Sequence, residues 1–111
     1  MNVYDTANRL AQEIKTSEEY VNYKNAKEYI DLKPELKEKL MEFQKLRYEA
    51  QIAAMQEGKE DKTKLEDAQK LYAELIQIDE VKKYFDTELN FNVMLADVNK
   101  IISESVEDVM K

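Results

Sequence analysis

Apolar side chains recur every three or four residues along most of the chain, a spacing that places them on one face of an α-helix. The first run predicts a helix from Asn2 or Asp5 to Ile14. Its apolar face consists of Val3, Ala7, Leu10, Ala11 and Ile14. Ser17 then offers a hydroxyl that we expect to cap a second, short helix, which ends before Pro34.

Pro34 suits the first turn of a third helix, because the first backbone N–H groups of a helix have no intrahelical partner anyway. We predict that this helix continues to Glu57, a length of about 24 residues or roughly 36 Å. Gly58 would serve as its C-terminal stop. The apolar stripe of this helix consists of Leu36, Leu40, Phe43, Leu46, Ala50 and Ala53.

Residues 58–63 form the only strongly polar connection, which we expect to be a loop and the most mobile segment. A fourth helix follows this loop, and Asp79 is interpreted as the cap of the last helix. The inward face of the fourth helix is predicted to consist of Leu65, Ala68, Leu71, Tyr72, Leu75 and Ile78.

The last helix carries the longest apolar stripe. Positions 81, 84, 88, 91, 95, 98, 102, 105 and 109 alternate between spacings of three and four, and seven of these nine are apolar. Such a stripe, over about 30 residues, makes a helix of roughly 45 Å, whereas a compact domain of this size has a radius of gyration of about 13 Å. Either a second copy of the chain covers the stripe, or the helix kinks near Asn90 or Asn92 and folds back.

We therefore expect the last helix to provide an oligomer or partner interface, supported by the third helix. Association into a homodimer or homotetramer would bury its apolar side chains. The residues predicted to form this interface are Phe85, Phe91, Met94, Leu95, Val98, Ile101 and Ile102.

The composition agrees with a helical protein. The 111 residues include one glycine and one proline, too few for the tight turns of a β-rich fold. Glu, Lys, Leu and Ala are the commonest residues, and all are strong helix formers. We predict an all-α fold, an antiparallel helical bundle of about five helices with long third and C-terminal helices, in a single helical domain over residues 1–111.

The net charge of −7 counts against direct nucleic-acid binding, which needs Lys and Arg to neutralise phosphates, and against an anionic membrane surface. Tyr20, Tyr23 and Tyr29 alternate with lysines, a pattern that also suits base stacking, but packing or partner contact fits an acidic chain better. No apolar run is long enough to span a bilayer. The first residues show no signal-peptide pattern, so we expect a cytoplasmic protein.

Residue types that most catalytic sites require are missing. The chain has no histidine and no cysteine, which excludes His-based general bases, Ser–His and Cys–His nucleophiles, and the usual zinc and iron–sulfur sites. A single glycine excludes the Gly-rich phosphate loops. We therefore predict no enzymatic activity, no cofactor and no metal. A carboxylate-based metal binder is the remaining alternative.

Glu88 is the carboxylate that stands out, because it occupies an apolar-stripe position between Tyr84 and Phe91. A carboxylate at such a position must be paired, hydrogen-bonded or at the edge of the core. Arg47 lies among core-facing positions of the third helix and is one of two arginines in the chain. One hypothesis is a structural Glu88–Arg47 ion pair; the other is an edge position that faces water.

Several segments resemble a known family through their order and spacing rather than through one sharp motif. They are Val3-Tyr4-Asp5-Thr6-Ala7-Asn8, Ser17-Glu18-Glu19-Tyr20, Tyr23 with Ala26, Phe43, and residues 81–88 followed by Phe91, Leu95, Val98 and Ile101. Together they cover nearly the whole chain and resemble the YlbF/YmcA family of Firmicute bacteria, and within it the YheA-like branch.

The resemblance implies a helical protein that forms homo- or hetero-oligomers and acts as a regulator of sporulation, competence or biofilm formation. Besides copies of the chain, it implies two kinds of partner: other family members, and RNA-decay machinery built on ribonuclease Y. Some family members hold an iron–sulfur cluster on C-terminal cysteines. This chain ends Val106-Glu107-Asp108-Val109-Met110-Lys111, which argues against a cluster-linked function.

Overall fold

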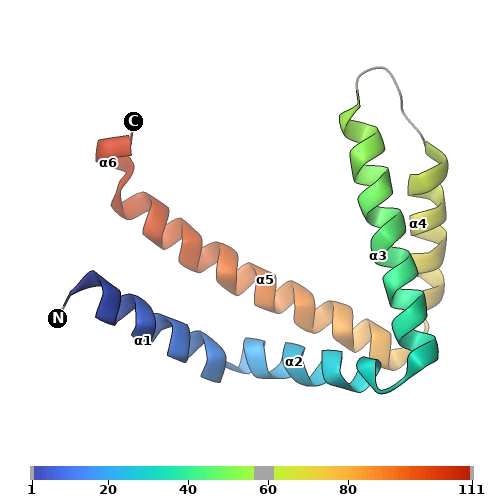
Figure 1. The fold of residues 1–111 in the computed structure, drawn as a ribbon, viewed down its shortest axis with the longest axis horizontal. Helices are drawn as coiled ribbons and strands as arrows, with labels where there is room; N and C mark the ends of the chain where they lie inside the picture. The colour runs from blue at the N-terminus through green and yellow to red at the C-terminus, as the bar shows by residue number, and fades with distance from the viewer. Residues whose placement is uncertain (1, 57–61, 111) are drawn as a thin grey trace. The chain divides into compact units, whose positions relative to one another are not determined.

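The computed structural model describes residues 2–56 and 62–110, and all regular structure within them is helical. The helices are α1 (Val3–Thr16), α2 (Glu18–Asp31), α3 (Pro34–Met55), α4 (Lys62–Leu75), α5 (Asp79–Ser105) and α6 (Glu107–Met110) (Figure 1). The predicted all-helical fold is therefore confirmed. The five expected helices are present, and α6 is an additional short helix beyond them.

Local sequence signals explain where these helices begin. The Asn2 side chain accepts a hydrogen bond from the backbone N–H of Asp5 at 2.9 Å, which caps α1. Ser17 Oγ accepts one from the backbone N–H of Tyr20 at 3.2 Å, the geometry of a cap on α2. Pro34 lies in the first turn of α3. Asp79 is the first residue of α5, one position inside the helix from the cap assigned to it, and its carboxylate favours the positive end of the helix dipole.

Two sequence predictions concern the region after α3. The helix ends at Met55, two residues before the predicted Glu57. The Gly58 stop and most of the predicted 58–63 loop lie outside the described residues. α4 begins at Lys62, so residues 62 and 63, which were predicted to end the loop, belong to a helix.

The chain divides into two compact units. The central unit is Lys27–Lys83, and the terminal unit combines Met1–Ala26 with Tyr84–Lys111. The central unit therefore contains α3 and α4, and the terminal unit contains α1 and α6; α2 and α5 contribute to both. The prediction of a single domain over residues 1–111 stays a prediction.

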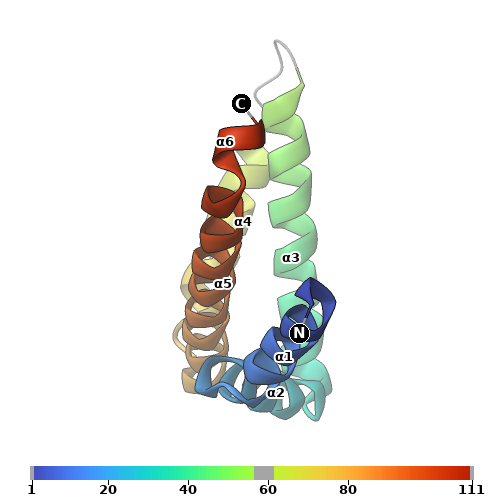
Figure 2. The same cartoon turned by 90° about the vertical axis from the view of Figure 1, so that its left-hand side faces the viewer.

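In the central unit, α3 and α4 pack against each other as an antiparallel pair (Figures 1 and 2). The rings of Phe43 and Tyr72 approach to 5.7 Å between centroids. Across the same pair, the Lys64 ammonium lies 2.6 Å from Glu49 and lowers the pKa of its carboxyl. The apolar side chains buried in this unit are Ile30, Leu40, Phe43, Ala68, Leu75 and Val81. Burial of each large aliphatic side chain stabilises the fold by roughly 1.5–3 kcal/mol.

The terminal unit buries fewer apolar side chains than the central unit. α1 has no buried residue, and α5 runs antiparallel to α2 beside it (Figure 1). On the apolar stripe of α5, cover is lost toward the C-terminal end: Tyr84 is 3% exposed, Phe91 and Leu95 are half-buried, and Ile102 is 52% exposed. The apolar stripe of the last helix thus begins in a packed region and ends on the surface.

The alternative of a kink at Asn90 or Asn92 does not occur, because α5 continues as one helix through both residues. The interruption comes later, at Val106, where the backbone forms a turn between α5 and α6. The Ser105 hydroxyl donates to the carbonyl of Ile102 at 2.6 Å. Such hydrogen bonds to the preceding turn compete with helix continuation and often bend helices.

Candidate functional site

An aromatic cluster joins α2 and α5 in the terminal unit. The Phe91 ring lies 6.0 Å from that of Tyr20 and 5.4 Å from that of Tyr23, between centroids. Tyr84 lies 5.5 Å from Tyr23 and 5.8 Å from Phe85. Tilted pairs of this kind contribute about 0.5–1.5 kcal/mol each beyond area burial. The cluster fixes the side of α5 that faces α2.

Glu88 is half-buried beside this cluster. The Tyr23 hydroxyl lies 3.4 Å from Glu88 Oε2, to which it donates, and 3.4 Å from the Tyr84 hydroxyl. Both distances exceed the usual range for O–H···O bonds, so these contacts are weak. They nevertheless give the carboxylate in the apolar stripe a polar neighbour.

The predicted partner of Glu88 has contacts of its own. Arg47 is exposed on α3, with its guanidinium 5.5 Å from the centre of the Phe43 ring. This is the geometry of a cation–π contact. Because Glu88 belongs to the terminal unit and Arg47 to the central unit, the ion pair between them stays a prediction.

The seven residues predicted to form the interface fall into two groups. Five are half-buried, and two of these, Phe85 and Phe91, have ring contacts within their own chain. The other half-buried side chains are Met94, Leu95 and Val98. Ile101 and Ile102 form the second group, at 68% and 52% exposure. The predicted stripe is therefore partly an internal contact and partly open surface.

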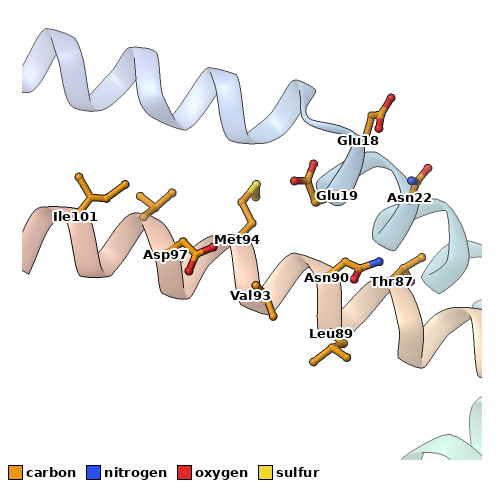
Figure 3. A pocket seen from close by; sticks show the side chains of 11 residues that line it. Glu18, Glu19, Asn22, Thr87, Leu89, Asn90, Val93, Met94, Asp97 and Ile101 are labelled. Atoms are coloured by element: carbon orange, nitrogen blue, oxygen red, sulfur yellow. The ribbon is translucent and has the colours of Figure 1, made fainter.

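A groove of about 560 Å³ lies in the terminal unit between the first turns of α2 and residues 87–101 of α5 (Figure 3). Figure 3 shows Glu18, Glu19 and Asn22 on α2, Met94 on the side of α5 that is turned toward α2, and Leu89 and Val93 at the edge of α5 that is turned away from it. The lining residues are Glu18, Glu19, Asn22, Thr87, Leu89, Asn90, Val93, Met94, Asp97, Val98 and Ile101.

The polar lining of the groove is acidic. It contains the carboxylates of Glu18, Glu19 and Asp97 and no Lys or Arg. Among the residues that the structure describes, none of these three carboxylates has an ion-pair partner. Leu89 and Val93 on the apolar side are 63% and 50% exposed, so this apolar surface is open to solvent.

Sequence reasoning found the apolar stripe but missed the groove. No binding role of Glu18, Glu19 or Asp97 was expected from the sequence. A signal was present: positions 89, 93, 97 and 101 lie one turn apart on one side of the helix, and Asp97 is the single charge among Leu89, Val93 and Ile101. Of that row, Ile101 belongs to the predicted interface, whereas Leu89, Val93 and Asp97 do not.

Two further observations bear on function. Within residues 2–56 and 62–110, no group of three or more acidic side chains lies so as to hold a metal ion. No helix in the described part of the chain is both long and apolar enough to cross a bilayer.

Comparison with known proteins identifies a family. Residues 3–107 match the model of the family described as "Control of competence regulator ComK, YlbF/YmcA". A UPF0342 protein of Caldicellulosiruptor saccharolyticus is 33% identical over 106 residues, 96% of this chain and 88% of that protein. UPF0342 protein STH1710 of Symbiobacterium thermophilum is 33% identical over 105 residues, 95% of this chain and 94% of that protein.

Solved structures share the fold. A protein of unknown function (DUF964) from Bacillus stearothermophilus has a TM-score of 0.82 at 19% identity, covering 98% of this chain and 96% of that one. Bacillus subtilis YheA has a TM-score of 0.70 at 22% identity, covering 98% and 99%. Bacillus subtilis RicA, in complex with RicF, has a TM-score of 0.63 at 21% identity, covering 98% and 96%. With the family match over residues 3–107, these likenesses confirm the resemblance found in the sequence: the chain belongs to the YlbF/YmcA family.

Proposed function

We propose that this chain is a non-enzymatic regulatory or scaffolding protein that works by binding protein chains, copies of itself included. The observation that carries the proposal is the loss of cover along the apolar stripe of the last helix. Ile101 and Ile102 are 68% and 52% exposed, and Val109 and Met110 in α6 are 76% and 78% exposed. Exposed apolar side chains that gather in one region are typical of protein-binding surfaces.

The relatives support a protein partner. The family is described by the control of a competence regulator, and RicA, which shares this fold, is known in complex with RicF. A helical protein of this fold therefore binds another protein in at least one case. We extend that mode of action to the present chain.

The distribution of burial suggests which residues contribute most. Phe85 and Phe91 have ring contacts within the chain, so we assign them to shaping the surface. Ile102 is exposed, and Leu95, one heptad earlier on the same side of α5, is half-buried. We propose that a homodimer or homotetramer forms over the side of α5 that carries Leu95 and Ile102.

Light scattering on a sizing column, over a range of protein concentrations, tests the proposal. We expect a dimer or tetramer, and we expect Ile102→Asp to raise the dissociation constant by at least about tenfold, because a charge at the interface must be desolvated. Leu65→Asp is the matched control, since Leu65 lies on α4 at 50% exposure. It should leave the native mass unchanged.

Two results would contradict the proposal. A wild-type chain that stays monomeric at every concentration would remove self-association. Dissociation by Leu65→Asp but not by Ile102→Asp would place the interface on the other unit. Circular dichroism confirms that each variant is still helical, and Leu95→Asp, at a half-buried position, repeats the test within the same stripe.

Two other predictions stand on the sequence resemblance. Contact with ribonuclease Y machinery, without direct nucleic-acid binding, would make this chain an accessory factor of RNA processing. Such a role would place it in the cytoplasm, where the sequence also predicts it.

A further inference from the structure

The groove between α2 and α5 has the shape of a site for a helix. Its lining extends along α5 from Thr87 to Ile101, a rise of roughly 21 Å, or about four helical turns. A second helix laid along α5 would cover this length with side chains three and four residues apart. A compact small molecule would contact only part of it.

The two helices contribute different chemistry to the groove. Leu89 and Val93 of α5 provide exposed apolar lining, whereas Glu18, Glu19 and Asn22 of α2 provide polar lining (Figure 3). A ligand that covers both must be apolar along one stripe and cationic or polar along its edge. An amphipathic helix with Lys or Arg beside its apolar stripe meets this requirement.

Asp97 is the residue that the fold itself does not explain. Glu18 and Glu19 interact favourably with the positive end of the α2 dipole, but Asp97 lies in the interior of α5, where no such benefit exists. It is exposed and, among the described residues, has no ion-pair partner. Aspartate is also a poor helix former. A cationic side chain from another protein would give this carboxylate a role.

The charge balance favours a different protein over a second copy at this site. The terminal unit carries ten Asp and Glu side chains against five Lys and Arg, a net charge of −5, whereas the central unit carries fourteen against twelve, a net charge of −2. A second terminal unit placed on this groove would add like charge to an acidic surface. Complementary charge comes from a basic partner.

We propose that the groove lined by Glu19, Asp97, Leu89 and Val93 binds a basic amphipathic helix of another protein. The inference rests on the proposed function, because it takes protein binding as the mode of action, and it names the chemistry of the partner. Met94, Val98 and Ile101 of the predicted interface also line the groove, whereas Leu95 and Ile102, which the self-association test uses, do not.

A synthetic peptide tests the proposal with the full-length chain. The probe is a fluorescein-labelled amphipathic peptide of roughly 18 residues, five helical turns, made of leucine on one face and lysine along its edges. The first control peptide has glutamate in place of lysine, and the second has the composition of the probe in a non-amphipathic order. Fluorescence anisotropy measures binding at low and at physiological ionic strength.

We expect one basic peptide to bind per chain, more weakly as salt rises, with little binding of either control peptide. Glu19→Lys combined with Asp97→Lys should weaken binding roughly tenfold, because two complementary charges become repulsive. Glu38→Lys combined with Glu42→Lys makes the same change in net charge on α3, outside the groove, and should weaken binding less than about twofold. Glu19→Gln with Asp97→Asn repeats the test by a milder change, should the lysine variant fold poorly.

Four outcomes would overturn the inference. Equal weakening by the α3 variant would mean that binding follows net charge alone. Equal binding of the non-amphipathic peptide would remove the helix requirement. A change in the native mass of the unliganded chain on substitution of Glu19 and Asp97 would show that a second copy occupies the groove. If the chain self-associates but binds no peptide, this inference fails while the proposed function stands.

Discussion

The central and terminal units are both built from amphipathic helices, but they differ in how many apolar side chains they bury. The central unit buries five large apolar side chains, Ile30, Leu40, Phe43, Leu75 and Val81, whereas Tyr84 is the one large side chain buried among the described residues of the terminal unit. Both units leave other apolar residues exposed. What distinguishes the terminal unit is that its exposed residues continue a stripe that is buried at its start.

This difference shows how one helical pattern can serve both stability and binding. A stripe contributes to the fold only where another helix of the chain covers it, as α2 covers Phe91 of α5. Beyond the end of that cover, the same spacing presents Ile101 and Ile102 to solvent. Under the proposed function, neighbouring turns of one helix set the stability of the fold and the affinity for a partner.

The largest expected effect lies in the core of the central unit. Leu75 is 1% exposed, so Leu75→Ala should lower the free energy of unfolding by about 2–5 kcal/mol. Leu95→Ala in the half-buried stripe of the terminal unit should lower it by only about 1–2 kcal/mol. Leu32→Ala, at 81% exposure, is the surface control and should stay within about 0.5 kcal/mol. Chemical denaturation measures all three.

Denaturation repeated at several protein concentrations distinguishes the two units further. If copies of the chain associate through the stripe, association stabilises the folded state, and the cost of Leu95→Ala grows as concentration rises. The cost of Leu75→Ala should not depend on concentration, because Leu75 is covered within its own chain. Equal costs for the two substitutions at every concentration would contradict the division of roles between the units.

Much of the fold was predictable because its signals are local. Apolar spacing, the serine at position 17 and the proline at position 34 determine where helices begin and which face turns inward, and the structure places α2 and α3 accordingly. The break at Val106 was missed, because valine is no helix breaker and the apolar spacing continues to Val109. Ser105, followed by Glu107 and Asp108, was the available sign of a new helix start.

The candidate site was less predictable. Periodicity shows which face of α5 is apolar, but it does not show where the covering helix ends, so it could not separate Phe91 from Ile101. The acidic groove depends on the approach of two segments distant in sequence, which brings Glu19 and Asp97 into one lining. No local pattern encodes that approach.

A smaller effect is expected at the start of α2. Ser17→Ala removes the hydroxyl that accepts a hydrogen bond from the backbone N–H of Tyr20, and loss of such a cap costs about 1 kcal/mol. Ser103→Ala is the control, because Ser103 lies inside α5, where alanine is the better helix former. In thermal unfolding, Ser17→Ala should lower the midpoint temperature, whereas Ser103→Ala should not lower it. Equal effects of the two would mean that Ser17 does not act as a cap.

The smallest effect concerns the ion pair between α3 and α4. Because the Lys64 ammonium lowers the pKa of the Glu49 carboxyl in the folded chain, ionised Glu49 stabilises the fold above the ordinary glutamate value of 4.5. That stabilisation is lost as pH falls through the lower, folded value. As pH falls below about 5, the free energy of unfolding of Glu49→Gln should therefore decrease slightly less than that of the wild type. Denaturation at a series of pH values measures this difference.

Lys64→Met separates this pair from the other carboxylates of the central unit. Without the ammonium that lies 2.6 Å from Glu49, the pKa of Glu49 should move back toward its ordinary value, and Glu49→Gln should change the pH profile little further. Lys45, at 4.0 Å, retains a minor influence. High salt should reduce the whole effect, because exposed pairs are screened. An undiminished effect of Glu49→Gln in the Lys64→Met background would show that Lys64 is not its source.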